Sequence, residues 1–206
     1  MDFFVSAFVT LAVVVDPLGL AAIFLAATQG ATTPARHSIA RRACLYAMLI
    51  LFGAALFGER LLQFLGVSLP AFRIAGGLLL FTLASEMVLG VREVHDARTA
   101  EQALAEHHAD IAAFPLATPL MAGPGAIAAT LLLATRAGMD PTRIAALCAA
   151  LIAVIAACFV TFRLATRVDQ LVGRAGNLLF AKLLGVLLAA LAVQFVVDGG
   201  RALLAG

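Results

Sequence analysis

The chain alternates long apolar runs with short polar connections. A helix that crosses the hydrocarbon core of a bilayer, about 30 Å thick, needs about 20 apolar residues. Six runs meet this requirement and predict six transmembrane helices, so the expected fold class is an all-α membrane protein. The predicted spans cover residues 3–28, 41–63, 70–90, 113–135, 142–165 and 178–199.

The first and fourth predicted spans contain helix-breaking residues near their middle. The stretch "VVVDPLGL" places Asp16, Pro17 and Gly19 in a run that is otherwise uncharged from Phe3 to Ala27. Proline removes a backbone donor and clashes with the preceding turn, and glycine allows dihedrals that a Cβ forbids. The fourth span contains "PLATPLMAGPGA", with three prolines and two glycines in eleven positions. Spans 1 and 4 are therefore predicted to be broken helices.

The third and sixth spans carry a short internal match. Arg73-x-x-Gly76 in "FRIAGGLLL" matches Lys182-x-x-Gly185 in "AKLLGVLLA". Three spans per half is an odd number, so two such halves must cross the membrane in opposite directions. We therefore expect two inverted three-helix repeats, in which interrupted spans at corresponding positions indicate a transporter site. The predicted organisation is repeat 1 over 1–90, a charged cytoplasmic linker over 91–112 and repeat 2 over 113–206.

Composition supports a membrane protein and excludes several other classes. The chain is 63% hydrophobic and 13% charged, with a mean hydropathy of +1.05, whereas soluble domains are about 45–50% apolar and about 25% charged. The net charge of +2 and the lack of a basic tract give no support to a nucleic-acid partner. The N-terminus "MDFFVSAFVT" has an acid where a secretory signal has a basic residue, so a retained span is expected.

The arginine distribution predicts the orientation, because Lys and Arg accumulate in cytoplasmic loops. Connections 1–2, 3–4 and 5–6 with the adjoining span ends hold eight arginines, against four on the other side. This places both termini outside. The eight are Arg36, Arg41, Arg42, Arg92, Arg98, Arg163, Arg167 and Arg174, and the four are Arg60, Arg136, Arg143 and Arg201.

The two interruptions supply the candidate substrate-binding residues. A carboxylate near the bilayer centre costs on the order of 2.5–3.5 kcal/mol, so such residues face an interior or aqueous cavity. The amides that begin the half-helix at "AGPGA" favour an anionic group such as a carboxylate. Arginine suits a carboxylate in two-point contact. The predicted set is Asp16, Pro17, Gly19, Arg73, Thr118, Gly123, Pro124 and Gly125.

Each of these features has a structural alternative. Asp16 is also suited to cap the second half of its broken helix without binding a ligand. The fourth span can be a kinked packing helix, because glycine and proline are common in membrane helices. Arg73 can extend its head group to the interface. Asp198 is expected to be interfacial.

The remaining polar residues and the cysteines predict no metal, cofactor or catalytic centre. The linker residues His95, Asp96, Glu106, His107, His108 and Asp110 fit no standard ligand spacing and are interpreted as a solvated loop. Cys44, Cys148 and Cys158 form no CxxC pair and are expected to be small buried residues. No GxSxG, Walker or HExxH motif occurs, so no enzyme is predicted. Small residues at Ala145, Ala146, Ala149 and Ala150 suit packing within one protomer or in a homo-oligomer.

Four segments resemble the MarC family of bacterial and archaeal inner-membrane proteins. They are "FVTLAVVVDPLGLAAIFLA", "FRIAGGLLLFTLASEMVLG", "FPLATPLMAGPGAIA" and "GVLLAALAVQFVVDG". The family takes its name from a link to multiple antibiotic resistance and is classed among six-span neutral amino-acid transporters. The resemblance therefore implies an inner-membrane location and carriage of small amino acids such as alanine, glycine or serine.

The sequence thus predicts a secondary transporter of small solutes with a midplane site between the broken spans 1 and 4. Asp16 would hold the ammonium of the substrate or a coupling ion, either a proton or sodium. Two alternatives remain open at this point. One is a protein that handles lipid or polyprenyl phosphate, using the same amide ends as an anion site. The other is an assembly protein that carries no cargo.

Overall fold

The computed structural model describes residues 2–91, 111–138 and 140–205, and every regular element within these ranges is a helix. The predicted all-α class is confirmed. The linker histidines at 95, 107 and 108, with most of their acidic neighbours, lie outside the described residues. The elements are α1 (Asp2–Val15), α2 (Gly19–Ala27), α3 (Thr33–Phe64), α4 (Leu69–Leu89), η1 (Ala112–Met121), α6 (Pro124–Ala137), α7 (Pro141–Arg163) and α8 (Ala165–Ala205).

Four of the described helices are long and apolar enough to cross a membrane, and a bent pair makes a fifth candidate. The bent pair is α1 with α2, which meet at 42°. The four long spans are Thr33–Phe64, Leu69–Leu89, Pro141–Arg163 and Gly176–Leu204. The predicted span 113–135 is instead built from two short elements, the π-helix η1 and the 14-residue α6. Its proline and glycine residues explain why no single span-length helix forms there.

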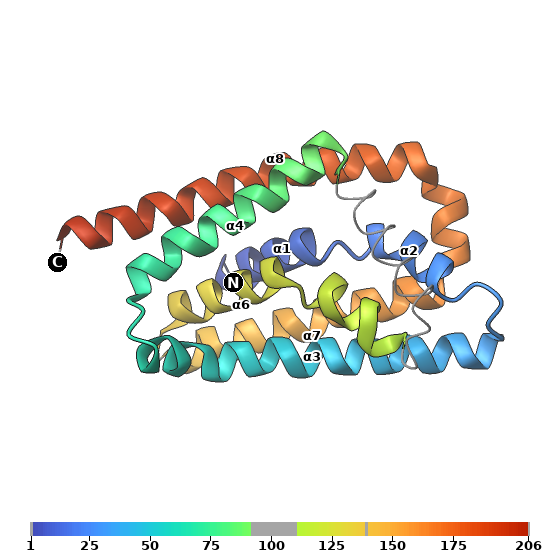
Figure 1. Cartoon of the computed structure of the whole chain (residues 1–206), viewed down its shortest axis with the longest axis horizontal. Helices are drawn as coiled ribbons and strands as arrows, with labels where there is room; N and C mark the ends of the chain where they lie inside the picture. Colours follow the sequence, from blue (N-terminus) through green and yellow to red (C-terminus); the bar gives the residue numbers. More distant parts are fainter. Residues whose placement is uncertain (1, 92–110, 139, 206) are drawn as a thin grey trace.

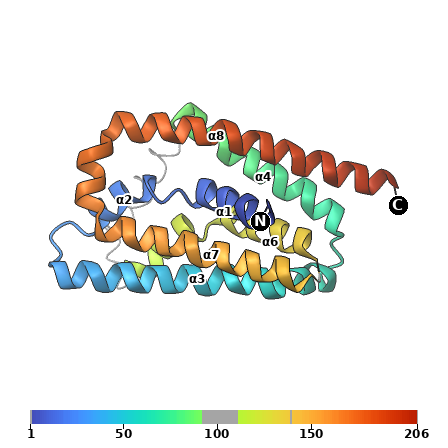
Figure 2. The ribbon, with the colours of Figure 1, turned by 180° about the vertical axis from the view of Figure 1, so that it is seen from behind.

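The helices form two groups that lie side by side (Figure 1). One group contains α3 and α7 with the broken elements α1–α2 and η1–α6. The other is an antiparallel pair, α4 with the long C-terminal part of α8, which we call the α4–α8 pair. The view from behind shows the same arrangement (Figure 2). The α3–α4 and α6–α7 connections and the C-terminus lie at one end of the molecule, which we call the α6–α7 end.

Residues with clear capping chemistry mark the helix boundaries. The Ser68 hydroxyl accepts a hydrogen bond from the Ala71 amide at 3.3 Å and begins α4. The Asp140 carboxylate accepts one from the Thr142 amide at 2.9 Å and begins α7. Gly90 ends α4 in the left-handed conformation with φ 73°, which glycine adopts without steric cost. The boundaries of α4 and α7 agree with the predicted ones to within two residues, whereas α3 begins at Thr33, eight residues before its predicted span.

Large apolar side chains are exposed along the outward faces of the long helices. Leu49 and Phe57 on α3 and Leu183 on α8 keep 62%, 62% and 57% of their surface exposed. Water would make so many exposed apolar side chains unfavourable, whereas lipid chains solvate them. The long helices therefore have the surface chemistry of membrane spans.

The two helices of the α4–α8 pair approach closely because glycines face backbone on the partner helix. A Cβ added at Gly77 would lie 2.8 Å from the carbonyl oxygen of Ala192. A Cβ at Gly185 would lie 3.1 Å from the carbonyl oxygen of Ala84, and one at Gly199 would lie 2.8 Å from that of Pro70. Small residues allow such close backbone contact, which is a main source of helix association in lipid.

We expect Gly77→Ala to lower the thermal stability of the protein in detergent. The new methyl group meets a backbone carbonyl, which cannot rotate away, and overpacking of this kind typically costs about 1–3 kcal/mol. The matched control is Gly53→Ala in α3, where an added Cβ has no neighbour within 4 Å. Alanine is a better helix former than glycine by about 1 kcal/mol, so this control should melt at or above the wild-type temperature. Equal melting of both variants would contradict the close packing.

Candidate functional site

The helix of the first span is interrupted at Asp16, as predicted. Asp16 adopts φ 53° between α1 and α2, and its amide still donates to the Ala12 carbonyl at 2.9 Å. The next residue, Pro17, has no N–H to continue the helical ladder. The Leu20 amide then donates to the Asp16 carbonyl at 3.1 Å, which starts the next helical turn.

The Asp16 side chain caps the helix that follows it. The Gly19 amide donates to the Asp16 carboxylate at 3.1 Å, so Asp16 caps α2, and the ligand-free role in the structural alternative stays a prediction. A Cβ at Gly19 would collide with the Asp16 carboxylate, which explains why glycine stands at the first position of α2. Aspartate tolerates the left-handed conformation better than most residues because its short side chain bonds to local backbone. A capping carboxylate has further lone pairs, so this role does not by itself exclude a ligand.

The second interruption opens a new helix at its amide end. The π-helix η1 finishes with the Ala122 amide donating to the Ala117 carbonyl at 2.8 Å. Gly123 is extended, and α6 begins at Pro124. A Cβ at Gly123 would collide with the carbonyl oxygen of Pro119, so glycine is needed where the chain doubles back. The predicted break at "AGPGA" is confirmed.

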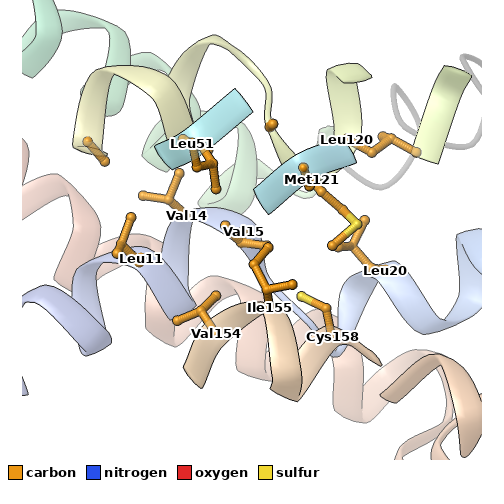
Figure 3. Packing of buried hydrophobic residues seen from close by; sticks show 14 of the residues in the cluster. Leu11, Val14, Val15, Leu20, Leu51, Leu120, Met121, Val154, Ile155 and Cys158 are labelled. Atoms are coloured by element: carbon orange, nitrogen blue, oxygen red, sulfur yellow. The ribbon is translucent and has the colours of Figure 1, made fainter. Parts of the chain in front are cut away.

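The two breaks lie against each other. A Cβ at Gly125 would lie 3.6 Å from Cγ1 of Val14 and 2.9 Å from Cδ2 of Leu83 on α4. Figure 3 shows Val14, Val15 and Leu20 of the first broken element beside Leu120 and Met121 of the second. Segments that are about 100 positions apart in the chain therefore meet at their interruptions.

The surroundings of Asp16 are buried and mainly apolar. Asp16 keeps 9% of its surface exposed. The Cys158 thiol of α7 lies within electrostatic reach of its carboxylate, and Cys44 of α3 approaches the Ile155 carbonyl at 3.9 Å. Cys44 and Cys158 are buried, as predicted, whereas Cys148 is only half-buried. The proximity of Cys158 to the first break leaves no pattern in the sequence. Figure 3 shows apolar side chains of the two broken elements and of α7 packed together in this region.

The other predicted site residues are placed differently. Thr118 is exposed, and its bond to Pro119 is cis. Arg73 is half-buried in the first turns of α4, with its Cβ 3.1 Å from the Cβ position of Gly199 on α8. Its Nε is buried and has no hydrogen-bond partner among the described residues. The contacts described for Arg73 are with α8, so its predicted role toward Asp16 or a substrate carboxylate stays a prediction.

Sequence reasoning missed an ion pair between two helices. Arg136 at the end of α6 contacts the Asp198 carboxylate of α8 at 2.9 Å. Gln194 donates to the other carboxylate oxygen at 2.7 Å, so Asp198 is more than an interfacial residue. The two partners are 62 positions apart and follow no spacing rule. The one available signal was that Arg136 and Asp198 fall at ends of spans predicted to face the same side.

The family of the chain is shown by its similarity to known proteins. The family described as MarC family integral membrane protein matches residues 1–204. The chain belongs to the MarC family. It is 35% identical to a UPF0056 membrane protein of Methanocaldococcus jannaschii, over 98% of this chain and 97% of that protein. It is 38% identical to one of Archaeoglobus fulgidus, over 97% and 92% of the two chains.

A bacterial relative extends the same result. The chain is 32% identical to the UPF0056 membrane protein YhcE of Escherichia coli, over 97% of this chain and 92% of that protein. No solved structure matches. The names of these relatives describe membrane proteins and give no substrate. This MarC-family chain is therefore a multi-pass integral membrane protein, as the resemblance implied.

We expect Asp16→Ala to destabilise the protein and Asp16→Asn to leave its stability close to wild type. Loss of a helix cap costs about 1 kcal/mol, and alanine adopts the left-handed conformation less readily than aspartate. Asparagine keeps both the acceptor oxygen and the tolerance of positive φ. Thermal unfolding in detergent measures the difference. An Asp16→Ala variant as stable as the wild type would show that the cap contributes nothing.

Proposed function

We propose that the protein is a secondary transporter of small neutral amino acids, with its substrate site at the meeting point of the two broken helices. The observation that carries this proposal is the contact of the two breaks, one of which holds a buried carboxylate. Interrupted helices at membrane depth are tolerated only where the free backbone groups are buried in protein or line a cavity. Transporters use such breaks to coordinate substrate and coupling ions.

One break would favour the negative end of a zwitterionic amino acid, and the other would favour its positive end. At the start of α6 the amides of Gly125 and Ala126 are among the first N–H groups of a helix, which have no partner within the helix. They would hold the substrate carboxylate, favoured by the helix dipole. Asp16 would hold the substrate ammonium or a coupling proton or sodium ion. Binding and movement of the solute require no covalent step, so the protein is not proposed to be an enzyme.

Reciprocal contacts in the α4–α8 pair support an inverted repeat. Gly77 faces the Ala192 carbonyl, and Gly185 faces the Ala84 carbonyl. Gly185 follows Gly77 by 108 positions, and Ala192 follows Ala84 by the same interval. In the proposed repeat, each contact would be the counterpart of the other across a two-fold axis between the helices. This register pairs Gly185 with Gly77, one position away from the pairing with Gly76 that the sequence match gave.

The membrane orientation is part of the same proposal. We place the protein in the inner membrane with both termini outside, so that the arginine-rich connections 1–2, 3–4 and 5–6 face the cytoplasm. The α2–α3 and α7–α8 connections lie together at the end opposite the α6–α7 end (Figure 1). Arg36 and Arg41 at the start of α3 and Arg163 at the end of α7 belong to that opposite end. Their common location is consistent with a cytoplasmic face.

Asp16→Asn should abolish or strongly reduce uptake of labelled alanine by proteoliposomes under a proton gradient. The substitution removes the charge that would bind an ammonium or a coupling ion, while it keeps the helix cap. The measurement is the initial rate of uptake at equal protein content, with a parallel sodium gradient to identify the coupling ion. Uptake by Asp16→Asn at the wild-type rate would contradict the role of Asp16.

The matched control is Asp140→Asn. Hydrogen bonds from the hydroxyl and the amide of Thr142 hold the pKa of the Asp140 carboxyl below its ordinary value, so this variant also removes a full negative charge at neutral pH. Asparagine remains a good helix cap. Uptake should be unchanged, because Asp140 lies in the α6–α7 connection, away from the breaks.

If polyprenyl phosphate stabilises the purified protein and no amino acid does, the lipid-handling alternative replaces the proposal.

A further inference from the structure

The Arg136–Asp198 pair joins the second broken element to the α4–α8 pair. The guanidinium of Arg136 lies 2.9 Å from the Asp198 carboxylate and 4.1 Å from the centre of the Phe195 ring. Gln194 fixes the carboxylate from the preceding helical turn at 2.7 Å. Phe195 is almost completely buried, at 1% exposed. One cation on α6 is therefore held by an acid and an aromatic face on α8.

The rest of the α6 contact with the α4–α8 pair is apolar. A Cβ at Gly76 of α4 would lie 2.9 Å from Cδ1 of Leu132, and Gly125 meets Leu83 in the same way. Apolar surfaces of small and flexible side chains have no directional contacts to hold one position. The directional contacts of α6 toward α8 are the ion pair and the ring contact of Arg136, while Arg143 of α7 donates to the Arg136 carbonyl at 3.4 Å.

α6 connects this ion pair to the candidate site. The helix starts at Pro124, directly after the second break, and Arg136 lies in its last turn. Its 14 residues span about 21 Å. Along its length α6 packs against α4, and it meets α8 at the Arg136 end. A movement of α6 away from the α4–α8 pair would therefore open the contact between α6 and α4, from the α6–α7 end to the break.

We propose that Arg136, Asp198 and Phe195 form a latch that keeps the α6–α7 end closed over the site between the breaks. This inference rests on the proposed transport function, because it assigns to the latch one of the two closures that alternating access requires. The Arg136 and Asp198 side chains keep 29% and 32% of their surface exposed. The pair is therefore partly shielded from water, so it is stronger than a fully exposed pair and can still open without burying an isolated charge.

The opposite end lacks a described counterpart of this ion pair at the end of α2. There Phe24 of α2 stacks on Phe162 of α7 with ring centres 4.5 Å apart, and Arg36 donates to the Thr28 carbonyl at 3.3 Å. The aromatic stack joins α2 to a helix of its own group, whereas the latch joins α6 to the other group. The two ends therefore differ in the kind of contact that must break for them to open.

The native Cys158 can report the opening of the α6–α7 end, because its thiol is buried within electrostatic reach of Asp16. The test uses a Cys44→Ala, Cys148→Ala background in nanodiscs, which leaves Cys158 as the single thiol. The rate of its modification by a charged methanethiosulfonate reagent is measured with the latch intact and with Arg136→Gln or Asp198→Asn. We expect each substitution to raise the rate about tenfold, which corresponds to about 1.4 kcal/mol in the opening equilibrium.

Two controls separate opening from general loosening. Asp140→Asn breaks the nearby Arg143–Asp140 ion pair, which lies within the start of α7 at 3.4 Å, and should leave the rate unchanged. The exchanged pair, Arg136→Glu with Asp198→Arg, restores the attraction and should return the rate toward that of the background. An unchanged rate in both single variants, or a raised rate that the exchanged pair does not reverse, would overturn the latch.

Alanine transport in proteoliposomes separates the latch from the proposed function. A latch that controls access predicts altered transport rates in Arg136→Gln and Asp198→Asn and partial recovery in the exchanged pair. If breaking the ion pair raises the Cys158 modification rate but the wild type transports no alanine, the latch is supported and the transport function is contradicted. If the wild type takes up alanine, Asp16→Asn does not, and breaking the ion pair leaves the modification rate unchanged, the transport function is supported and the latch is contradicted.

Discussion

A bilayer supplies no water to backbone groups, so a helix that is interrupted at membrane depth must satisfy its free N–H and C=O groups from within the protein. This constraint accounts for the centre of the structure. Asp16 gives its own carboxylate to the first amide of α2, and the doubled-back chain at Gly123 starts α6 under cover of α4 and α1. The two interruptions contact each other, and Asp16 and Gly123 are buried there, whereas Thr118 and Pro124 keep exposed surface. The surrounding helices enclose the interruptions and so reduce the free-energy cost of breaking a helix at membrane depth.

Most of the architecture could be predicted from the sequence because its signals are local. Length and hydropathy located the long spans, and proline with glycine located both breaks. The break in the fourth predicted span was correct, but the sequence did not specify its form, in which the π-helix η1 precedes the break and α6 follows it. That outcome depends on hydrogen-bond patterns that proline content alone does not specify.

The parts that could not be predicted are long-range contacts. Cys158 lies beside Asp16 because α7 packs against α1, and Arg136 meets Asp198 because α6 ends beside α8. Neither pairing leaves a periodic signal in one sequence. The sequence match pairs Gly76 with Gly185, whereas the facing carbonyls of Ala192 and Ala84 relate Gly77 to Gly185, a difference that only the packing of α4 on α8 reveals. Gly76 instead meets Leu132 of α6.

The length of α3 has a consequence for how the protein sits in its membrane. Its 32 residues span about 48 Å, whereas the hydrocarbon layer is about 30 Å thick. The surplus includes the first turns, which carry Arg36, Arg41 and Arg42 at head-group height. Such anchors set the vertical position of a protein against the bilayer. A bilayer of different thickness would change the tilt of α3, and with it the depth at which the packed helices hold Asp16.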